Sequence, residues 1–261
     1  MRRIRIVGLC LVAVFAMSAV VATGASADNP EYGRCLKQKT GKTKYTTAKC
    51  TVVASGEKEN FEWIPEPGPK PGFTAALKPT TIATLETKAG TKVTCKKLAA
   101  VGSYTGLTTV KTSQTDFSEC ESGGIKCNTK GAGTGIIKVK NLEGELGTIK
   151  KEPITTKTKI GNVLWPEGGT STSGSEFVEF ECGTLTVKVK NSVISPVTSN
   201  AMKLTATVKF TAAKGVQKPT KFEGGPNNFL ESKFSAAPYE QSGQSATTIQ
   251  TNEEKVEVRS L

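Results

Sequence analysis

Side chains able to perform acid–base or nucleophilic chemistry are scarce, because the 261-residue chain contains no histidine. This absence excludes Ser-His-Asp and Cys-His catalysis, histidine metal ligation and the usual pH switch near neutrality. Aspartate is limited to Asp28 and Asp116, so calcium loops built on repeated aspartates are not expected. We therefore predict a non-enzymatic protein with no catalytic residue, no cofactor and no metal site.

Glu179 and Glu181 form the carboxylate pair that comes nearest to an active site. Two carboxyl groups across a cleft can hydrolyse a glycosidic bond when an apolar pocket raises the pKa of one of them. Here both glutamates lie on the strand face opposite Val178 and Phe180, where solvation is expected. A histidine-free, glutamate-dependent hydrolase is therefore an unfavoured alternative.

Aromatic rings offer a different chemistry, because flat rings stack on sugars. Trp63 and Trp165 each stand close to a proline, near the end of an expected element. A tryptophan in such a place contacts a ligand or, more commonly, covers the edge of the core. A carbohydrate-binding module that uses Trp63 or Trp165 is thus one alternative function.

Six cysteines remain once Cys10, in the apolar N-terminal segment, is set aside: Cys35, Cys50, Cys95, Cys120, Cys127 and Cys182. An even number in an exported protein predicts three disulfides. A Cys35–Cys50 bond would close a loop of about 15 residues, worth roughly 3 kcal/mol in the chain-entropy model. A zinc site is disfavoured, because histidine and any Cys-x-x-Cys pair are missing.

The pairing of the other four cysteines depends on a faint internal duplication. The segments that end at Cys95 and Cys182 are alike, because in each an apolar residue two positions earlier shares the cysteine's strand face. We therefore predict a Cys95–Cys182 bond across the core and a local Cys120–Cys127 bond over a Gly-Gly turn. The rival pairing joins Cys95 to Cys120 and Cys127 to Cys182.

The N-terminus has the pattern of a cleaved export signal. Three arginines among the first five residues precede an apolar run over 6–22, and the small residues Ala25-Ser26-Ala27 follow. We expect a signal peptide at 1–27, a mature chain that begins at Asp28, and no membrane span after cleavage. The protein should therefore be secreted to an oxidising compartment.

The remaining chain divides at a proline-rich stretch. Residues 28–64 form a small cysteine-containing module, 65–72 a stiff linker with prolines at alternate positions, and 73–261 a larger domain. Apolar and polar residues alternate through most of 73–261, and glycine-containing turns recur at short intervals. The pattern predicts an all-β protein whose large domain is an antiparallel β-sandwich or a barrel-like sheet.

The charge favours neither nucleic acid nor a specific phosphate site. The net charge is +12, but lysine supplies most of it, and Arg34 and Arg259 are the only arginines beyond the signal. Lysines that alternate with threonines commonly keep a sheet soluble, and base recognition favours arginine and aromatic residues. We predict a binding or structural role at or outside the cell envelope, with an anionic cell-wall polymer or polysaccharide as the partner.

Several short motifs resemble one known group of proteins. They include 32–35 (Tyr-Gly-Arg-Cys), 61–63 (Phe-Glu-Trp), 117–120 (Phe-Ser-Glu-Cys), 180–182 (Phe-Glu-Cys) and 221–225 (Lys-Phe-Glu-Gly-Gly). The chain resembles a family of exported, lysine- and threonine-rich proteins that occur in many copies in high-GC soil bacteria. The family has no assigned activity. The resemblance thus implies export, paired cysteines and β-structure, and it transfers no functional residue.

Overall fold

The computed structural model describes residues 29–38, 44–53, 60–154, 157–197 and 202–259. The expected signal peptide at 1–27 and the expected first mature residue, Asp28, lie outside these ranges. Every regular element of the described chain is a strand, which confirms the all-β prediction. Within the same ranges there is no helix of the length and hydropathy needed to cross a membrane.

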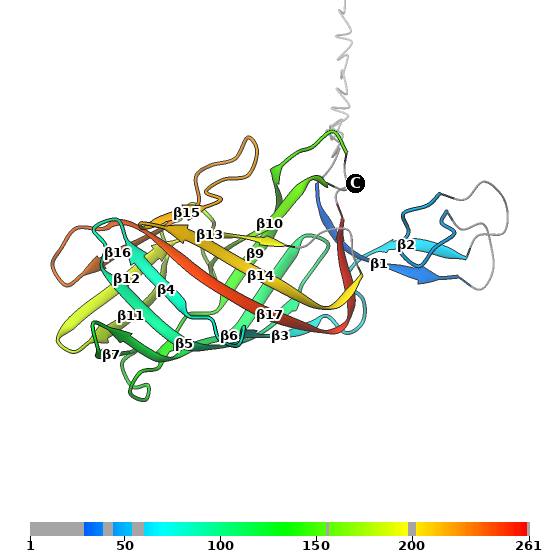
Figure 1. Cartoon of the computed structure of the whole chain (residues 1–261). Coiled ribbons are helices and arrows are strands. Elements are labelled where there is room, and N and C mark those ends of the chain that lie inside the picture. The colour runs from blue at the N-terminus through cyan, green and yellow to red at the C-terminus, as the bar shows by residue number, and fades with distance from the viewer. Residues whose placement is uncertain (1–28, 39–43, 54–59, 155–156, 198–201, 260–261) are drawn as a thin grey trace, which may run out of the picture.

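The strands are named in chain order (Figure 1). They are β1 (Glu31–Lys37), β2 (Phe61–Pro65), β3 (Gly72–Leu77), β4 (Ala83–Thr87), β5 (Lys92–Tyr104), β6 (Thr109–Ser122), β7 (Ile125–Asn128), β8 (Ile137–Lys138), β9 (Leu142–Lys150), β10 (Lys159–Pro166), β11 (Glu176–Cys182), β12 (Leu185–Asn191), β13 (Val193–Val197), β14 (Lys203–Ala213), β15 (Val216–Lys218), β16 (Leu230–Phe234) and β17 (Glu240–Arg259).

The alternating sequence pattern determines which side of each strand faces inward. In β12, Val187 and Val189 are buried, whereas the lysines beside them are partly exposed. In β14, Ala206, Val208 and Phe210 are less exposed than the residues between them. Since side chains alternate between the two faces of a strand, these sequences produce one apolar and one polar sheet face.

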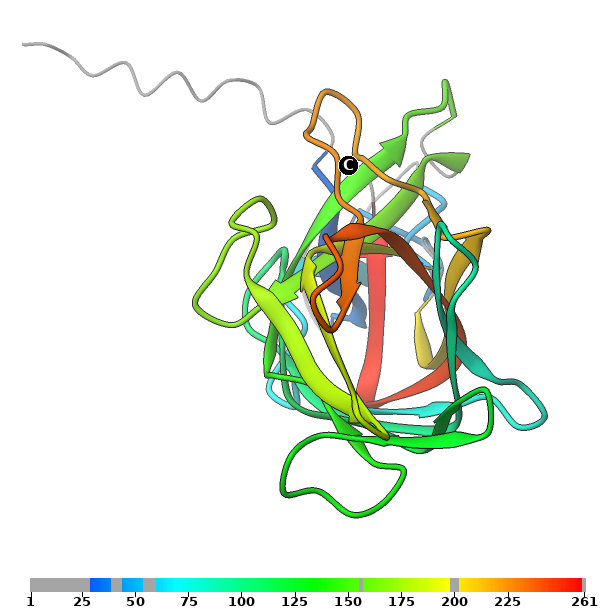
Figure 2. The ribbon, with the colours of Figure 1, turned by 90° about the vertical axis from the view of Figure 1, so that its left-hand side faces the viewer.

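The sheet closes on itself as an antiparallel barrel. The circuit passes through eight strands, β17, β4, β5, β6, β7, β11, β12 and β16, and β16 pairs with β17 again. Figure 2 shows the view into this barrel, with the strands arranged around its interior. Of the two architectures left open by the sequence, the structure therefore has the barrel.

The long strands β5, β6 and β17 continue beyond this circuit into the second half of the barrel. There the wall is completed by β3, β9, β10, β13 and β14. Among the described residues no paired register joins β13 to β14, although the two strands are close neighbours. We call the line between β13 and β14 the seam.

Two of the three apolar clusters fill the barrel, and the third belongs to the N-terminal hairpin. The barrel clusters centre on Phe180 at one end and on Tyr104 at the other. The hairpin cluster contains Cys35, Cys50 and Trp63. The hairpin projects from one end of the barrel in Figure 1.

The structure links this hairpin to the barrel by backbone pairing as well as by the proline-rich segment. β1 pairs with β2 on one side and, over Glu31–Gly33, with the end of β17 on the other. Tyr32 is buried in the second barrel cluster. The first strand of the predicted N-terminal module therefore also contributes to the interior of the barrel.

The disulfides confirm one predicted pairing and overturn the other two. Cys35 is bonded to Cys50, as predicted. The predicted Cys95–Cys182 and Cys120–Cys127 bonds are wrong, because the structure has the rival pairs Cys95–Cys120 and Cys127–Cys182. Each of these bonds joins residues directly opposite on neighbouring strands, with Cα atoms 4.0 and 4.1 Å apart.

Sheet geometry explains the correction. Cys95 lies on β5 and Cys182 on β11, with β6 and β7 between them. Three strand spacings amount to about 14 Å along the sheet, which is far beyond the Cα separation of about 7 Å that a disulfide can span. The two cysteines do face the same interior, as the alternation indicates, but each is bonded to the cysteine on an adjacent strand.

Candidate functional site: the barrel interior

The interior of the barrel contains a cavity of about 230 Å³. Its lining is mainly apolar and comes from both barrel clusters, including Phe73, Phe180, Val189 and Val256. For comparison, an apolar cavity of about 150 Å³ stays dry and binds benzene. The barrel thus has room for one small molecule in an apolar environment.

The cavity exists because several inward positions carry alanine. Ala75, Ala83, Ala100 and Ala206, on β3, β4, β5 and β14, all line it. An eight-stranded barrel is just wide enough for large side chains to fill it, or for smaller ones to leave space for one ligand. The short side chains on one half of the wall favour the second arrangement.

Polar side chains gather at the tyrosine-containing end of the cavity. The Tyr32 hydroxyl donates a hydrogen bond to Asn162 Oδ1 at 2.8 Å, and the Tyr104 hydroxyl donates to Asn252 Oδ1 at 2.9 Å. Gln250 Nε2 donates to both the Tyr104 hydroxyl and Asn252 Oδ1. The Tyr32 and Tyr104 ring centroids are 4.5 Å apart, so the two hydrogen-bonded groups are in contact.

Both tyrosines remain neutral over the physiological range. Burial raises the pKa of Tyr32 well above its ordinary value, and the neighbouring Tyr104 raises it further. Burial also raises the pKa of Tyr104, against the opposing effect of its hydrogen bonds with Gln250 and Asn252. Desolvation has this direction for any acid whose charged form is anionic. The two phenols therefore act as neutral donors.

Two further polar residues line the cavity beside the seam. Ser195 on β13 is only 2% exposed, and its hydroxyl has no hydrogen-bond partner within the described chain. Lys203 on β14 lines the same cavity and is exposed to solvent, and no carboxylate in the described chain pairs with it. A buried hydroxyl without a partner is unfavourable in a folded protein. The Ser195 hydroxyl differs from the other unpartnered hydroxyls, of Thr47, Ser232 and Ser242, because Ser195 lines the cavity.

A continuous series of contacts joins Ser195 to Lys203 around this end of the cavity. Ser195 is opposite Asn162 in the β10–β13 ladder, and Asn252 Nδ2 donates to the Lys203 carbonyl oxygen at 3.3 Å. We call this set the polar collar. Its members are Ser195, Asn162, Tyr32, Tyr104, Asn252 and Lys203.

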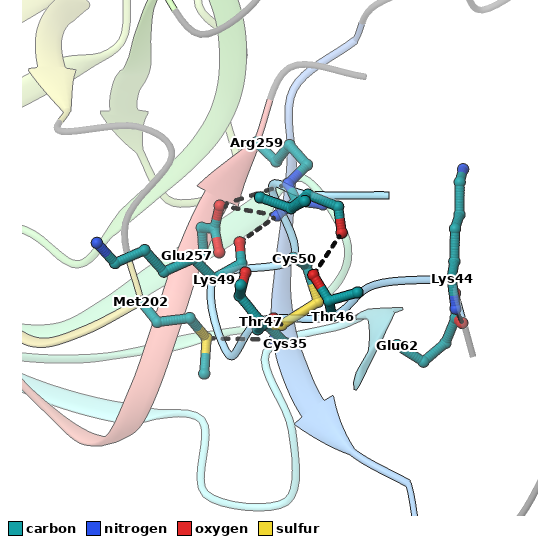
Figure 3. The surroundings of a disulfide bond; sticks show 11 residues. Cys35, Lys44, Thr46, Thr47, Lys49, Cys50, Glu62, Met202, Glu257 and Arg259 are labelled. Carbon is teal, nitrogen blue, oxygen red and sulfur yellow. Dashed lines mark hydrogen bonds and ion pairs between the residues drawn. A yellow bond between two sulfur atoms is a disulfide. The ribbon is translucent and has the colours of Figure 1, made fainter. Parts of the chain in front are cut away.

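Trp63 is buried in the N-terminal hairpin. It is 9% exposed, and the Arg259 guanidinium carbon lies 4.1 Å from the centre of its ring. It packs in the hairpin cluster with the Cys35–Cys50 bond. Arg259 also contacts Glu257 and the Lys49 carbonyl oxygen, close to this disulfide in Figure 3. Of the two alternatives for this tryptophan, the structure has the one that covers a core.

Trp165 lies on the outer side of β10, because its neighbour Leu164 lines the cavity. It is half-buried and directly opposite Glu143 on β9. Lys111, 2.9 Å from Glu143, lowers the pKa of that carboxyl group. The structure does not bring Trp63 and Trp165 together, and neither contributes to the cavity.

Glu179 and Glu181 are exposed on the outer face of β11. Glu179 forms a 2.6 Å ion pair with Lys188 on the neighbouring strand. Both glutamates border a shallow surface hollow that also contains Lys130, Lys138 and Lys140. This lysine-rich setting differs from the apolar pocket that a glycosidase acid requires.

Many lysines of the wall lie beside glutamates rather than in an uninterrupted positive patch. Lys111 contacts both Glu143 and Glu167, and Lys190 contacts Glu231 at 3.1 Å. Exposed ion pairs of this kind contribute little to stability. They do reduce the net positive charge that a polyanion would meet on those parts of the surface.

The residues that line the cavity were not predicted from the sequence. The available signal lay in the inward positions of the alternating strands, where Ala206, Gln250 and Asn252 replace the large apolar side chains expected there. Small and polar residues at inward positions free volume inside the sheet, but the sequence does not show whether a neighbouring strand fills it.

Comparisons with known proteins give no relative: no family model, curated protein or solved structure matches this chain.

Within the described ranges, no group of three or more cysteine, aspartate or glutamate side chains is placed to hold a metal ion.

Proposed function

We propose that this chain is an exported, non-enzymatic binding protein that holds one small, largely apolar molecule inside its barrel. The observation that carries the proposal is the 230 Å³ apolar cavity inside the barrel. A concave apolar pocket with a few polar groups is typical of small-molecule sites. The three disulfides support an oxidising compartment, and so a role outside the cytoplasm.

The test is titration with a neutral apolar fluorophore small enough for the cavity, 1-naphthylamine, whose short-wavelength emission rises in a dry site. Wild-type protein should give a saturable increase with one site per chain. The variant Ala206→Phe should abolish it, because the added ring occupies the cavity. Thr207→Phe is the matched control, since Thr207 is the next residue of β14 and is exposed.

The outcomes separate a cavity site from surface binding. Wild-type and Thr207→Phe proteins should bind the fluorophore alike, and the melting temperature of Ala206→Phe should show that it is folded. Equal binding by folded Ala206→Phe would place the fluorophore elsewhere. No saturable signal from the wild type would contradict the proposal directly.

Attachment to an anionic cell-wall polymer or polysaccharide stays a prediction. It is supported by the net charge, which is +12 for the full chain and 32 − 23 = +9 without the three arginines of the expected signal peptide, and the ion pairs between lysines and glutamates weaken it. Sedimentation with purified cell wall at low salt tests it, because lysine contacts with a polyanion should weaken as salt is added. Protein that stays in the supernatant at low salt would remove the envelope role.

A further inference from the structure

We infer that the ligand of the barrel carries a carboxylate, and that this group is bound at the polar collar by Ser195 and Lys203. The inference rests on the proposed function and adds to it the chemical class of the ligand. That class is a small amphipathic acid, with an apolar body in the cavity and an anionic group beside the seam.

Two groups of the polar collar are free to meet a ligand. The Tyr32 hydroxyl is used by Asn162, and the Tyr104 hydroxyl both donates to Asn252 and accepts from Gln250. These groups satisfy one another, as a buried polar network must. In contrast, the Ser195 hydroxyl is buried without a partner, and Lys203 has no carboxylate beside it within the described ranges.

Both free groups can donate hydrogen bonds. A lysine ammonium has three donors and no acceptor, and a serine hydroxyl can donate one hydrogen bond. Both can therefore serve an acceptor, and the positive charge of Lys203 favours an anion. A carboxylate has two oxygens, so it can accept from both side chains at once. An ammonium ligand would instead meet a like charge at Lys203.

The positions of Ser195 and Lys203 also fit a single ligand group. Ser195 and Lys203 lie on the two strands that border the seam, and both line the cavity. The contacts through Asn162, the two tilted tyrosine rings and the Asn252 hydrogen bond to the Lys203 backbone carbonyl place both residues at this end of the cavity. From this end, the apolar lining continues toward the cluster around Phe180. A ligand with its anion at the collar thus extends its apolar chain into the cavity.

The cavity volume sets the size of the probe. Scaling from a benzene-sized cavity of about 150 Å³ gives room for about nine non-hydrogen atoms. Octanoate, 1-octanol and octylamine have this size and the same chain, and they differ in the polar group alone. Each is used to displace 1-naphthylamine from wild-type protein at pH 8.

Wild-type protein should bind octanoate about tenfold or more tightly than 1-octanol, because hydrogen bonds to charged groups are stronger than those to neutral ones. Octylamine should bind most weakly. Lys203→Met should remove the preference for octanoate, because it should weaken octanoate binding far more than 1-octanol binding. Lys203→Arg should retain the preference, and Ser195→Ala should weaken octanoate binding severalfold.

The matched control is Lys209→Met, because Lys209 is an exposed lysine on the same strand that does not line the cavity. It should behave as wild type toward all three ligands. Equal affinity of wild-type protein for octanoate and 1-octanol would overturn the inference and leave the apolar site intact. Equal loss of the preference in Lys203→Met and Lys209→Met would overturn it as well. Failure of the fluorophore itself to bind would instead refute the proposed function and the inference with it.

Discussion

The barrel and the N-terminal hairpin both bury apolar side chains, but they do so in different ways. The barrel has two large apolar clusters inside a closed sheet, and two disulfides join neighbouring strands of its wall. The hairpin cluster has three buried members, Cys35, Cys50 and Trp63, with Arg259 stacked on the tryptophan. A large closed sheet can leave its interior partly empty, whereas the hairpin depends on one covalent bond and one cation.

Because of this difference, substitutions in the two regions should affect different properties, stability in the hairpin and binding in the barrel. In the barrel, backbone pairing and disulfides maintain the wall, so alanines and free polar groups inside it are tolerated. In the hairpin, each buried side chain supports the fold, and none lines the cavity except Tyr32, which enters the barrel from β1. Changes in the hairpin should therefore alter local stability, and changes at inward barrel positions should alter binding.

The largest expected effect is the loss of the disulfide between β7 and β11. Its cysteines are 55 residues apart, so the double variant Cys127→Ala/Cys182→Ala should lose about 4 kcal/mol of unfolding free energy in the chain-entropy model. Urea unfolding followed by circular dichroism measures this loss. A shift below about 1 kcal/mol would show that strand pairing alone maintains the wall.

The loss of Cys35–Cys50 should be smaller and should remain local. The loop spans 15 residues, which corresponds to about 3 kcal/mol for Cys35→Ala/Cys50→Ala. Hydrogen exchange should rise in 44–53 and β2, while β4, β5 and β11 stay protected. If exchange rises equally in the barrel strands, the hairpin and the barrel unfold together and the contrast between them fails.

Arg259 should show how far the hairpin depends on one cation. Glu257 is 1% exposed, and Arg259 Nη2 lies 3.2 Å from its Oε1 atom. Burial raises the pKa of Glu257 above its ordinary 4.5, and Arg259 partly opposes this rise. Arg259→Met should therefore cost about 2 kcal/mol at pH 7.5, because a buried carboxylate would lose its partner.

The stability cost of Arg259→Met should depend on pH, because it arises from the charged form of Glu257. A carboxyl group with a raised folded pKa favours folding most below its unfolded pKa, and this contribution is lost as pH rises through the folded value. The cost of Arg259→Met should thus shrink as pH falls toward 4, where Glu257 is protonated. In the double variant Arg259→Met/Glu257→Gln most of the stability should return at pH 7.5. A cost independent of pH would assign the loss to stacking on Trp63 instead.

These regions also differ in how much of them the sequence predicts. Alternation specifies the strands, and the short loop between Cys35 and Cys50 specifies their bond, because both depend on residues close in the chain. The pairing of Cys95 with Cys120 depends instead on which strands become neighbours, and this is set by the whole circuit of the barrel. The similar segments around Cys95 and Cys182 indicated the shared inward face and gave no information on distance.

The cavity was unpredictable for a related reason. An inward alanine such as Ala206 looks the same in sequence whether a neighbouring strand fills the space or leaves it open. Only closure of the sheet decides this, and closure is a sum of long-range pairings. Likewise, Ser195 within an apolar run gives no sign that its hydroxyl has no partner in the described chain.

The smallest expected effect on stability, at Ser195, gives the most specific test of the contrast between the two regions. Its buried hydroxyl is desolvated and unpartnered in the described chain, so Ser195→Ala should leave the free energy of unfolding unchanged or raise it by up to about 1 kcal/mol. A residue that destabilises the fold slightly and faces the cavity has the profile of a group retained for binding. Ser192 is the matched control, because its buried hydroxyl contacts Asn228 Oδ1 at 2.8 Å and the Ser171 carbonyl oxygen at 2.7 Å. Ser192→Ala should therefore lose about 1–2 kcal/mol. Equal losses at both positions in urea unfolding would mean that Ser195 has a structural partner, and its assignment to the ligand would have to be withdrawn.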